Sequence, residues 1–148
     1  WCTARLKVDP TKKYLKSIGE KNYRLFIGIA ADEPQRIKEH CYPLYEWGIT
    51  EKQALEYCYS KGFDWGGLYK IFNRVSCWCC PLQPIPELRK LRTLFPDLWQ
   101  KLLDMENNQN YKFKFKPTYS VQELEERFAY EDIHGIQKKF KRSLTSSK

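Results

Sequence analysis

The residues of this chain that are best suited to chemistry are cysteines, and half of them stand together. The chain has six cysteines among 148 residues, and three of them lie in the segment Cys77-Trp-Cys79-Cys80. Cys77 and Cys80 form a C-x-x-C pair, whose spacing lets two thiolates converge on one ion while the backbone turns between them. Pro81 follows directly and favours that turn. Such a pair can chelate zinc, ligate an iron–sulfur cluster or act as a redox dithiol.

Two further thiols complete the expected set of ligands. Cys79 lies beside the pair, and Cys2 can join it from a distance in the sequence. Four thiolates suit either tetrahedral zinc or a four-iron (4Fe-4S) cluster. No secretion signal opens the sequence, so crowded thiols indicate metal ligands or redox groups rather than disulfides. The alternative is a group of reduced, buried cysteines without a function, which is also the simplest interpretation of Cys58.

The element that must position the polar residues is a short apolar run. Residues 25–30 have the continuous apolar pattern of a strand that is buried on both faces of a parallel sheet. Asp32 and Glu33 follow it, at the edge where open α/β sheets bind ligands. One strand cannot make a sheet alone, so its neighbours either lie hidden in the loops or precede the sequence.

Helices are expected to make up most of the remaining chain. Two capping boxes predict helix starts, one at Thr50 with Gln53 and one at Ser120 with Glu123. Other local signals complete the pattern: a stop at Gly62, a short helix over 65–72, proline-initiated helices at Pro86 and Pro96, and a strand-like alternation over 111–116.

Composition limits the classes of protein to be considered. The chain is long enough for one domain, and 42% of its residues are hydrophobic. It contains no apolar stretch near the roughly 20 residues that a membrane span needs, so we expect a soluble, cytoplasmic protein. The first residue, Trp1, reads like the interior of a motif, which indicates a piece of a longer protein.

Charge is concentrated at one end of the sequence. The net charge is +8, and residues 137–148 carry five Lys and Arg residues with no acidic one. Such a run is typical of a solvated tail, and less often of an arm that binds nucleic acid. We expect little fixed structure over residues 135–148, because Ile136, Phe140 and Leu144 bury too little surface to offset the entropy of ordering.

Four stretches occur in a fixed order along the chain: Trp1-Cys-Thr-x-x-Leu-Lys7, Gly28-Ile-Ala-Ala-Asp-Glu-x-x-Arg36, Tyr42-Pro-Leu-Tyr-Glu-Trp-Gly48 and Arg74-Val-Ser-Cys-Trp-Cys-Cys-Pro81. Together they resemble one known family, the phosphoadenosine phosphosulfate (PAPS) reductase-like proteins of the PP-loop ATP pyrophosphatase superfamily. The resemblance covers residues 1–106.

The resemblance implies a fold and a domain organisation. The fold class is α/β, as the helix-rich C-terminal portion of an adenine-nucleotide alpha-hydrolase-like (PP-loop) fold. Residues 1–106 would be the C-terminal part of the PAPS reductase-like domain, residues 107–134 a helical extension, and residues 135–148 the basic tail.

The resemblance also implies roles for charged residues around an adenine nucleotide. Lys7 and Arg36 would supply positive charge to the nucleotide or to a substrate anion, Asp32 and Glu33 would make polar contacts at the strand end, and Arg74 would face the same pocket. The cluster-bearing members of the superfamily have a tandem Cys-Cys far ahead of a C-x-x-C pair. Cys2 occupies the second place of that tandem, which leaves the choice between an iron–sulfur cluster and zinc open.

The sequence departs from the family pattern at three places. The family's Ser-Gly-Gly-x-Asp-Ser phosphate loop is absent, so this chain lacks that nest of backbone N–H groups for ATP phosphates and is expected to be inactive alone. Ala30 stands where PAPS reductases commonly have an arginine. The segment 131–135 has no cysteine where those enzymes carry a nucleophilic one, so reduction of PAPS itself is not expected.

Two functions of different classes follow from the sequence. The first is part of a PAPS reductase-like enzyme that acts on an adenine nucleotide by ATP-dependent adenylation or sulfur transfer, completed by an N-terminal part of the same protein that supplies the phosphate loop. The second is a non-enzymatic, zinc-stapled module that binds nucleic acid through its basic tail.

Overall fold

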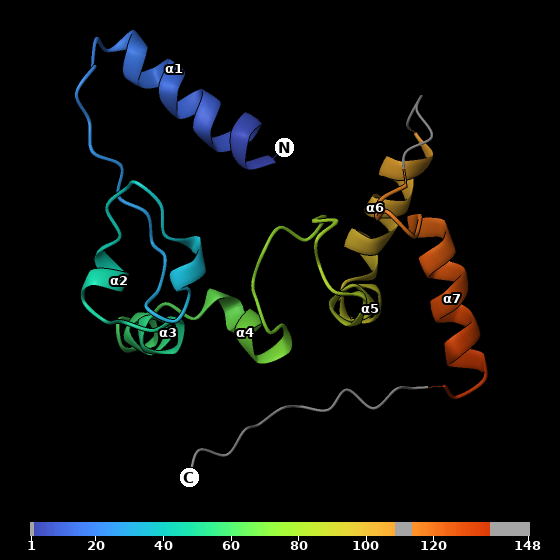
Figure 1. Ribbon diagram of the computed structural model, residues 1–148. Helices are drawn as coiled ribbons and strands as arrows, with labels where there is room; N and C mark the ends of the chain where they lie inside the picture. Colours follow the sequence, from blue (N-terminus) through green and yellow to red (C-terminus); the bar gives the residue numbers. More distant parts are fainter. Residues whose placement is uncertain (1, 109–113, 137–148) are drawn as a thin grey trace. The chain divides into compact units, whose positions relative to one another are not determined.

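The computed structural model describes residues 2–108 and 114–136 and divides the chain into two compact units. The first unit is Trp1–Phe63 and the second is Asp64–Lys148. Figure 1 labels the α-helices of both units. No helix of the described residues is long and apolar enough to cross a membrane.

The first unit consists of short helices joined by irregular segments. Its elements are η1 (a π-helix, Ala4–Val8), α1 (Asp9–Ser17), η2 (a 3-10 helix, Pro34–Arg36), α2 (Pro43–Glu46) and α3 (Glu51–Ser60). The predicted capping box begins α3: the Gln53 N–H donates to the Thr50 hydroxyl, and the Thr50 N–H donates back to the Gln53 side chain. Gly62 follows the helix with a φ of 82°, a backbone conformation that favours glycine at a helix end.

The apolar run at residues 25–30 makes one isolated bridge instead of the predicted strand. Phe26 pairs with Cys41 in a parallel bridge, in which the Ile27 N–H donates to the Cys41 carbonyl and the Cys41 N–H donates to the Leu25 carbonyl. Ile29 is buried, whereas the Phe26 residue is 64% exposed. A strand buried on both faces needs covered faces and paired edges, and within the described residues only the segment at Cys41 pairs with this run. The described structure is therefore helix-rich, as predicted, and contains no strand.

The second unit contains α6 and α7, the two longest helices of the described residues. Its elements are η3 (a 3-10 helix, Trp65–Gly67), α4 (Leu68–Ile71), α5 (Ile85–Leu94), α6 (Pro96–Asn107) and α7 (Val121–Ile133). The short helix predicted for residues 65–72 is divided at Gly66 and Gly67, which both have positive φ angles. Prolines begin α5 and α6 as predicted, with α5 starting one residue before Pro86. The strand-like alternation fails at residues 114–116, which are irregular, and residues 111–113 lie outside the described parts.

One hydrophobic core joins α5, α6 and α7. Its buried members are Leu88, Leu91, Trp99, Leu102, Leu103, Val121, Leu124 and Phe128. The side chain of Glu106 supports the start of α7, because its carboxylate accepts hydrogen bonds from the Val121 N–H at 2.6 Å and the Gln122 N–H at 3.3 Å. A carboxylate at a helix N-terminus satisfies free N–H groups and opposes the positive end of the helix dipole.

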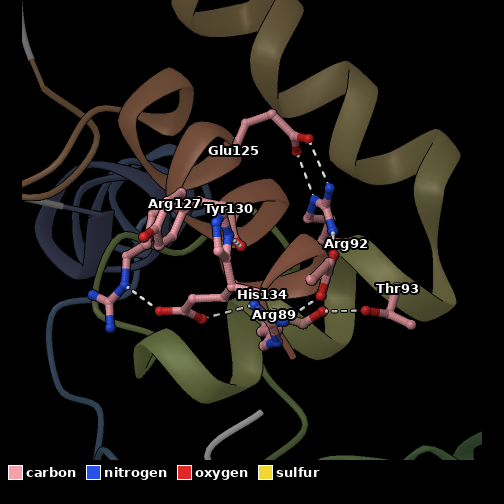
Figure 2. A network of polar contacts seen from close by, with 9 residues as sticks. Arg89, Arg92, Thr93, Glu125, Arg127, Tyr130 and His134 are labelled. Atoms are coloured by element: carbon pink, nitrogen blue, oxygen red, sulfur yellow. Dashed lines mark hydrogen bonds and ion pairs between the residues drawn. The ribbon is translucent and has the colours of Figure 1, made fainter. Parts of the chain in front are cut away.

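A network of charged side chains covers one side of this core. Figure 2 shows the Arg92 guanidinium facing Glu125, with N–O distances of 2.8 Å for both hydrogen bonds. Glu125 also accepts a hydrogen bond from the indole N–H of the buried Trp99 at 2.6 Å. Arg89 pairs with Glu131 at 2.9 Å and also with Asp132. These pairs connect α5 and α6 to α7 through oriented, charge-assisted contacts.

The core places α7 in the same unit as α5 and α6. Leu124 and Phe128 of α7 fill the core that α5 and α6 begin. The division between residues 106 and 107, where the family resemblance ends, stays a prediction. The tail over residues 137–148, with Phe140 and Leu144, lies outside the described residues.

The pairing of Glu125 predicts an acid-sensitive contribution to stability. The hydrogen bonds from Arg92 hold the pKa of the Glu125 carboxyl below its ordinary value of 4.5, so this contribution is present above pH 4.5 and is lost as the pH falls through the lowered folded-state pKa. We expect Glu125→Gln to reduce the free energy of unfolding at pH 7 by about 1–3 kcal/mol.

Urea unfolding at a series of pH values measures this effect. The difference between Glu125→Gln and the unaltered chain should shrink as the pH falls below 4.5. Glu126→Gln is the matched control, because Glu126 is exposed and interacts with Gln122 of the same helix. A constant difference between pH 7 and pH 2 would show that the Arg92–Glu125 pair does not supply the effect.

Candidate functional site

The candidate site is the loop between α4 and α5, residues 72–84, with the cavity beside it. The predicted turn of the C-x-x-C pair is present: the Cys80 N–H donates to the Cys77 carbonyl oxygen, with an N–O distance of 3.1 Å. A second turn follows at once, in which the Gln83 N–H donates to the Cys80 carbonyl oxygen at 3.1 Å. Two consecutive turns let this short segment reverse direction before Pro84 and α5.

Charged side chains fix both ends of this loop to the helical core. The Glu87 carboxylate is buried and accepts from the Asn73 N–H at 3.2 Å and from the Lys90 ammonium at 2.8 Å. The same ammonium donates to the Ile71 carbonyl oxygen at 2.7 Å. At the other end, the Lys116 ammonium donates to the Gln83 carbonyl oxygen at 2.7 Å, and also to that of Pro81. The loop is therefore bonded to both the helix that follows it and the segment before α7.

The three clustered cysteines lie in different surroundings. Cys77 is exposed, whereas Cys79 and Cys80 are partly buried, and Cys79 packs against the hydrophobic core. Cys77 lines a cavity of about 300 Å³, and Cys79 lines a second one of about 170 Å³. Among the described residues no three His, Cys, Asp or Glu side chains are arranged to hold a metal ion. Cys2 belongs to the first unit, where it is exposed next to η1.

The larger cavity brings two of the predicted site residues together. Arg74 and Cys77 both contribute to its wall, along with Ser76 and Gln83. The Gln83 side-chain N–H groups donate to the Ser76 hydroxyl at 3.3 Å and to the Cys77 carbonyl oxygen at 2.9 Å. The side-chain oxygen of Gln83 is buried and has no hydrogen-bond partner within the described structure. A buried unpaired oxygen is costly, so the side chain that braces the cysteine loop is only half satisfied.

The other predicted nucleotide contacts lie in the first unit. Asp32, Glu33 and Arg36 follow the extended run within one short segment. The Asp32 carboxylate accepts from the Glu51 N–H at 3.1 Å, so it supports the start of α3. Arg36 forms an ion pair with Glu33 at 2.6 Å, which leaves this segment with little net charge. Lys7 is exposed on η1.

Sequence reasoning missed the residues that hold the loop. Gln83, Glu87, Lys90 and Lys116 were not singled out, although each bonds the loop or its flanks. Glu87 and Lys90 lie three residues apart on one helix, a spacing that indicates an ion pair but not its bonds to Ile71 and Asn73. Lys116 bonds to Pro81 and Gln83, which lie 35 and 33 residues away in the sequence, and no local sequence pattern indicates these contacts.

Comparisons with known proteins give relatives but no family. No family model matches the sequence, and no solved structure matches it. The chain is similar to two proteins of Methanocaldococcus jannaschii. It is 28% identical over 123 residues to the uncharacterized protein MJ0066, which covers 68% of this chain and 24% of that protein. It is 25% identical over 118 residues to the uncharacterized protein MJ0973, which covers 71% of this chain and 28% of that protein. The chain thus spans about a quarter of the length of each relative.

Proposed function

We propose that this chain is part of a PAPS reductase-like PP-loop enzyme that acts on an adenine nucleotide, by ATP-dependent adenylation or sulfur transfer. The observation that carries the proposal is the wall of the larger cavity, where Arg74 and Cys77 of one sequence motif meet. An anion-binding side chain and a thiol beside one cavity suit the binding of an anionic substrate and sulfur transfer. The order of the four sequence motifs gives independent support.

The α/β part of the proposal concerns the extended run at residues 25–30. We propose that this run becomes a strand by pairing with segments supplied elsewhere in a longer protein. Two observations support this idea: Leu25 and Phe26 are 40% and 64% exposed, and the match to this chain covers only 24% and 28% of the two relatives. Burial of exposed apolar side chains would favour such docking. Asp32 would then follow the end of a sheet strand, where ligands bind in open α/β folds.

Two features of the cysteine loop suit a metal ion or cluster: its thiol donors and the turn between Cys77 and Cys80. Cys77 and Cys80 would provide the first pair of thiolates, and Cys79 a third. The buried Gln83 side-chain oxygen, which lacks a hydrogen-bond partner in the described structure, leaves an unsatisfied acceptor beside this loop. Bound zinc would supply structural bracing or Lewis acidity, and a 4Fe-4S cluster would supply electron transfer.

The nucleotide contacts in this proposal come from the first unit. Arg36 and Lys7 would bind phosphate oxygens, and Asp32 and Glu33 would supply polar contacts nearby. Glu33 holds Arg36 at 2.6 Å in the described structure, so an incoming phosphate would compete with that carboxylate for the guanidinium. Arg74 would bind an anionic substrate from the second unit.

The first prediction from this proposal concerns bound metal. After anaerobic purification, Cys77→Ser and Cys80→Ser should each lower the metal content of the chain at least tenfold, in line with the loss of a direct ligand. Elemental analysis for zinc and iron gives the measurement. Cys58→Ser is the matched control, because Cys58 lies on α3 in the first unit. Unchanged metal content in both loop variants would show that Cys77 and Cys80 do not bind a metal ion or cluster.

The second prediction concerns ATP. Calorimetry should show that the 148-residue chain alone binds ATP more weakly than a micromolar dissociation constant, which corresponds to about −8 kcal/mol, because it lacks the phosphate loop. The full-length protein that contains the chain should bind ATP with micromolar affinity, and Arg36→Ala should weaken that binding roughly tenfold. Arg24→Ala, at another exposed arginine, is the control. A full-length protein that does not bind ATP would refute the proposed function.

A further inference from the structure

The cavity beside the cysteine loop has walls that suit an apolar molecule. It has a volume of about 300 Å³ and lies within the second unit, between α4, α5, α6 and the cysteine loop. Its apolar walls are formed by Leu68, Phe72, Val75, Leu91, Phe95 and Leu98, with the Trp78 side chain beside them. The Phe72 and Phe95 rings are stacked with their centroids 5.9 Å apart. This volume is at the small end of ligand pockets and fits one ring with a short side chain.

The charge on the cavity wall is a single cation. Among the described residues that line the cavity, Arg74 alone is charged, and no aspartate or glutamate joins it. Arg74 is exposed, and within residues 2–108 and 114–136 it makes no ion pair or hydrogen bond. The guanidinium is therefore free to pair with an incoming anion, and its planar fork matches the two oxygens of a carboxylate.

The remaining polar groups on the cavity wall are few, and the Gln83 amide already donates hydrogen bonds within the loop. The Gln83 amide donates to Ser76 and to the Cys77 carbonyl, and its own oxygen is buried. A ligand with many hydroxyl groups would lose hydrogen bonds to water without replacing them here. An ammonium group on the ligand would find no carboxylate. These two exclusions disfavour ribose-bearing nucleotides and free amino acids, and they leave an apolar body with one anionic end.

We propose that this cavity binds a small monocarboxylate with an aryl or branched alkyl body, whose carboxylate pairs with Arg74. The apolar body fills the space between the Phe72 and Leu98 side chains. The cavity is thus a substrate site within the second unit, and Cys77 of the proposed metal site contributes to its wall.

Its role as a substrate site rests on the proposed function. ATP-dependent adenylation activates carboxylates: a carboxylate oxygen forms a bond to the α-phosphorus of ATP, and the bond from that phosphorus to the bridging oxygen breaks, which releases pyrophosphate. The occupancy of the cavity by a carboxylate does not require ATP, so it can be tested without a nucleotide.

The test is a titration of the 148-residue chain with 3-phenylpropionate, followed by calorimetry and by NMR of leucine methyl groups. We expect a submillimolar dissociation constant and shifts confined to cavity residues such as Leu68, Leu91 and Leu98. The neutral amide 3-phenylpropionamide should bind at least tenfold more weakly, because it cannot form the charged pair with Arg74. Phenylalanine should also bind at least tenfold more weakly, because its ammonium lacks a partner.

Variants test separately whether binding depends on the charge of Arg74 and on the open volume of the cavity. Arg74→Gln should weaken 3-phenylpropionate binding at least tenfold and leave the amide unaffected, whereas Arg24→Gln should change neither. Leu68→Trp, which fills the cavity, should abolish binding of both ligands. The comparison of acid with amide needs no variant, so it stands even if a substitution prevents folding.

Three results would overturn the inference: no binding of 3-phenylpropionate, equal binding of acid and amide, or tighter binding of AMP than of the acid at the same methyl groups. None of these bears on whether the full-length protein binds ATP. Failure of the cavity proposal and failure of the proposed function are therefore distinguishable.

Discussion

The interaction on which the second unit depends is the burial of apolar side chains between α5, α6 and α7. Leu88, Val121 and Leu124 are completely buried, and Phe128 is nearly so. Both anchors of the cysteine loop belong to or adjoin these helices: Glu87 and Lys90 lie on α5, and Lys116 lies just before α7. Because the loop has no regular structure of its own, its shape follows from the packing of the helices beneath it. The Arg92–Glu125–Trp99 contact joins all three helices and couples their packing to protonation of one carboxylate.

This dependence divides the candidate site into a side that packs against the core and an exposed side. Cys79 faces the hydrophobic core, whereas Cys77 and Arg74 face the cavity and are exposed. An ion held by Cys77 and Cys80 would therefore lie at the cavity wall, in the same segment as Cys79, which packs against the core. A substrate carboxylate on Arg74 would then lie in the same cavity that Cys77 lines, which gives the thiol cluster and the anion site a common location.

Local sequence signals predicted the helices. The features that depend on contacts between distant residues were not predicted. The capping boxes at Thr50 and Ser120 and the proline at Pro96 act within one helical turn, so the sequence specifies them directly. The strand at residues 25–30 was not found in the described structure, because a strand depends on neighbours that its own residues do not encode. The cavity wall joins Leu68 to Leu98 across two helices, and the loop anchor Lys116 is more than thirty residues from its partners; neither leaves a local pattern.

The helical core holds the cysteine loop, and thiol reactivity is a direct test of this claim. In the metal-free chain, iodoacetamide labelling with peptide mapping should modify the exposed Cys77 at least tenfold faster than Cys79, which packs against the core. Lys116→Met, which removes the bonds to Pro81 and Gln83, should accelerate the labelling of Cys79 more than that of Cys77. Labelling of Cys79 as fast as Cys77 in the unaltered folded chain would contradict the claim.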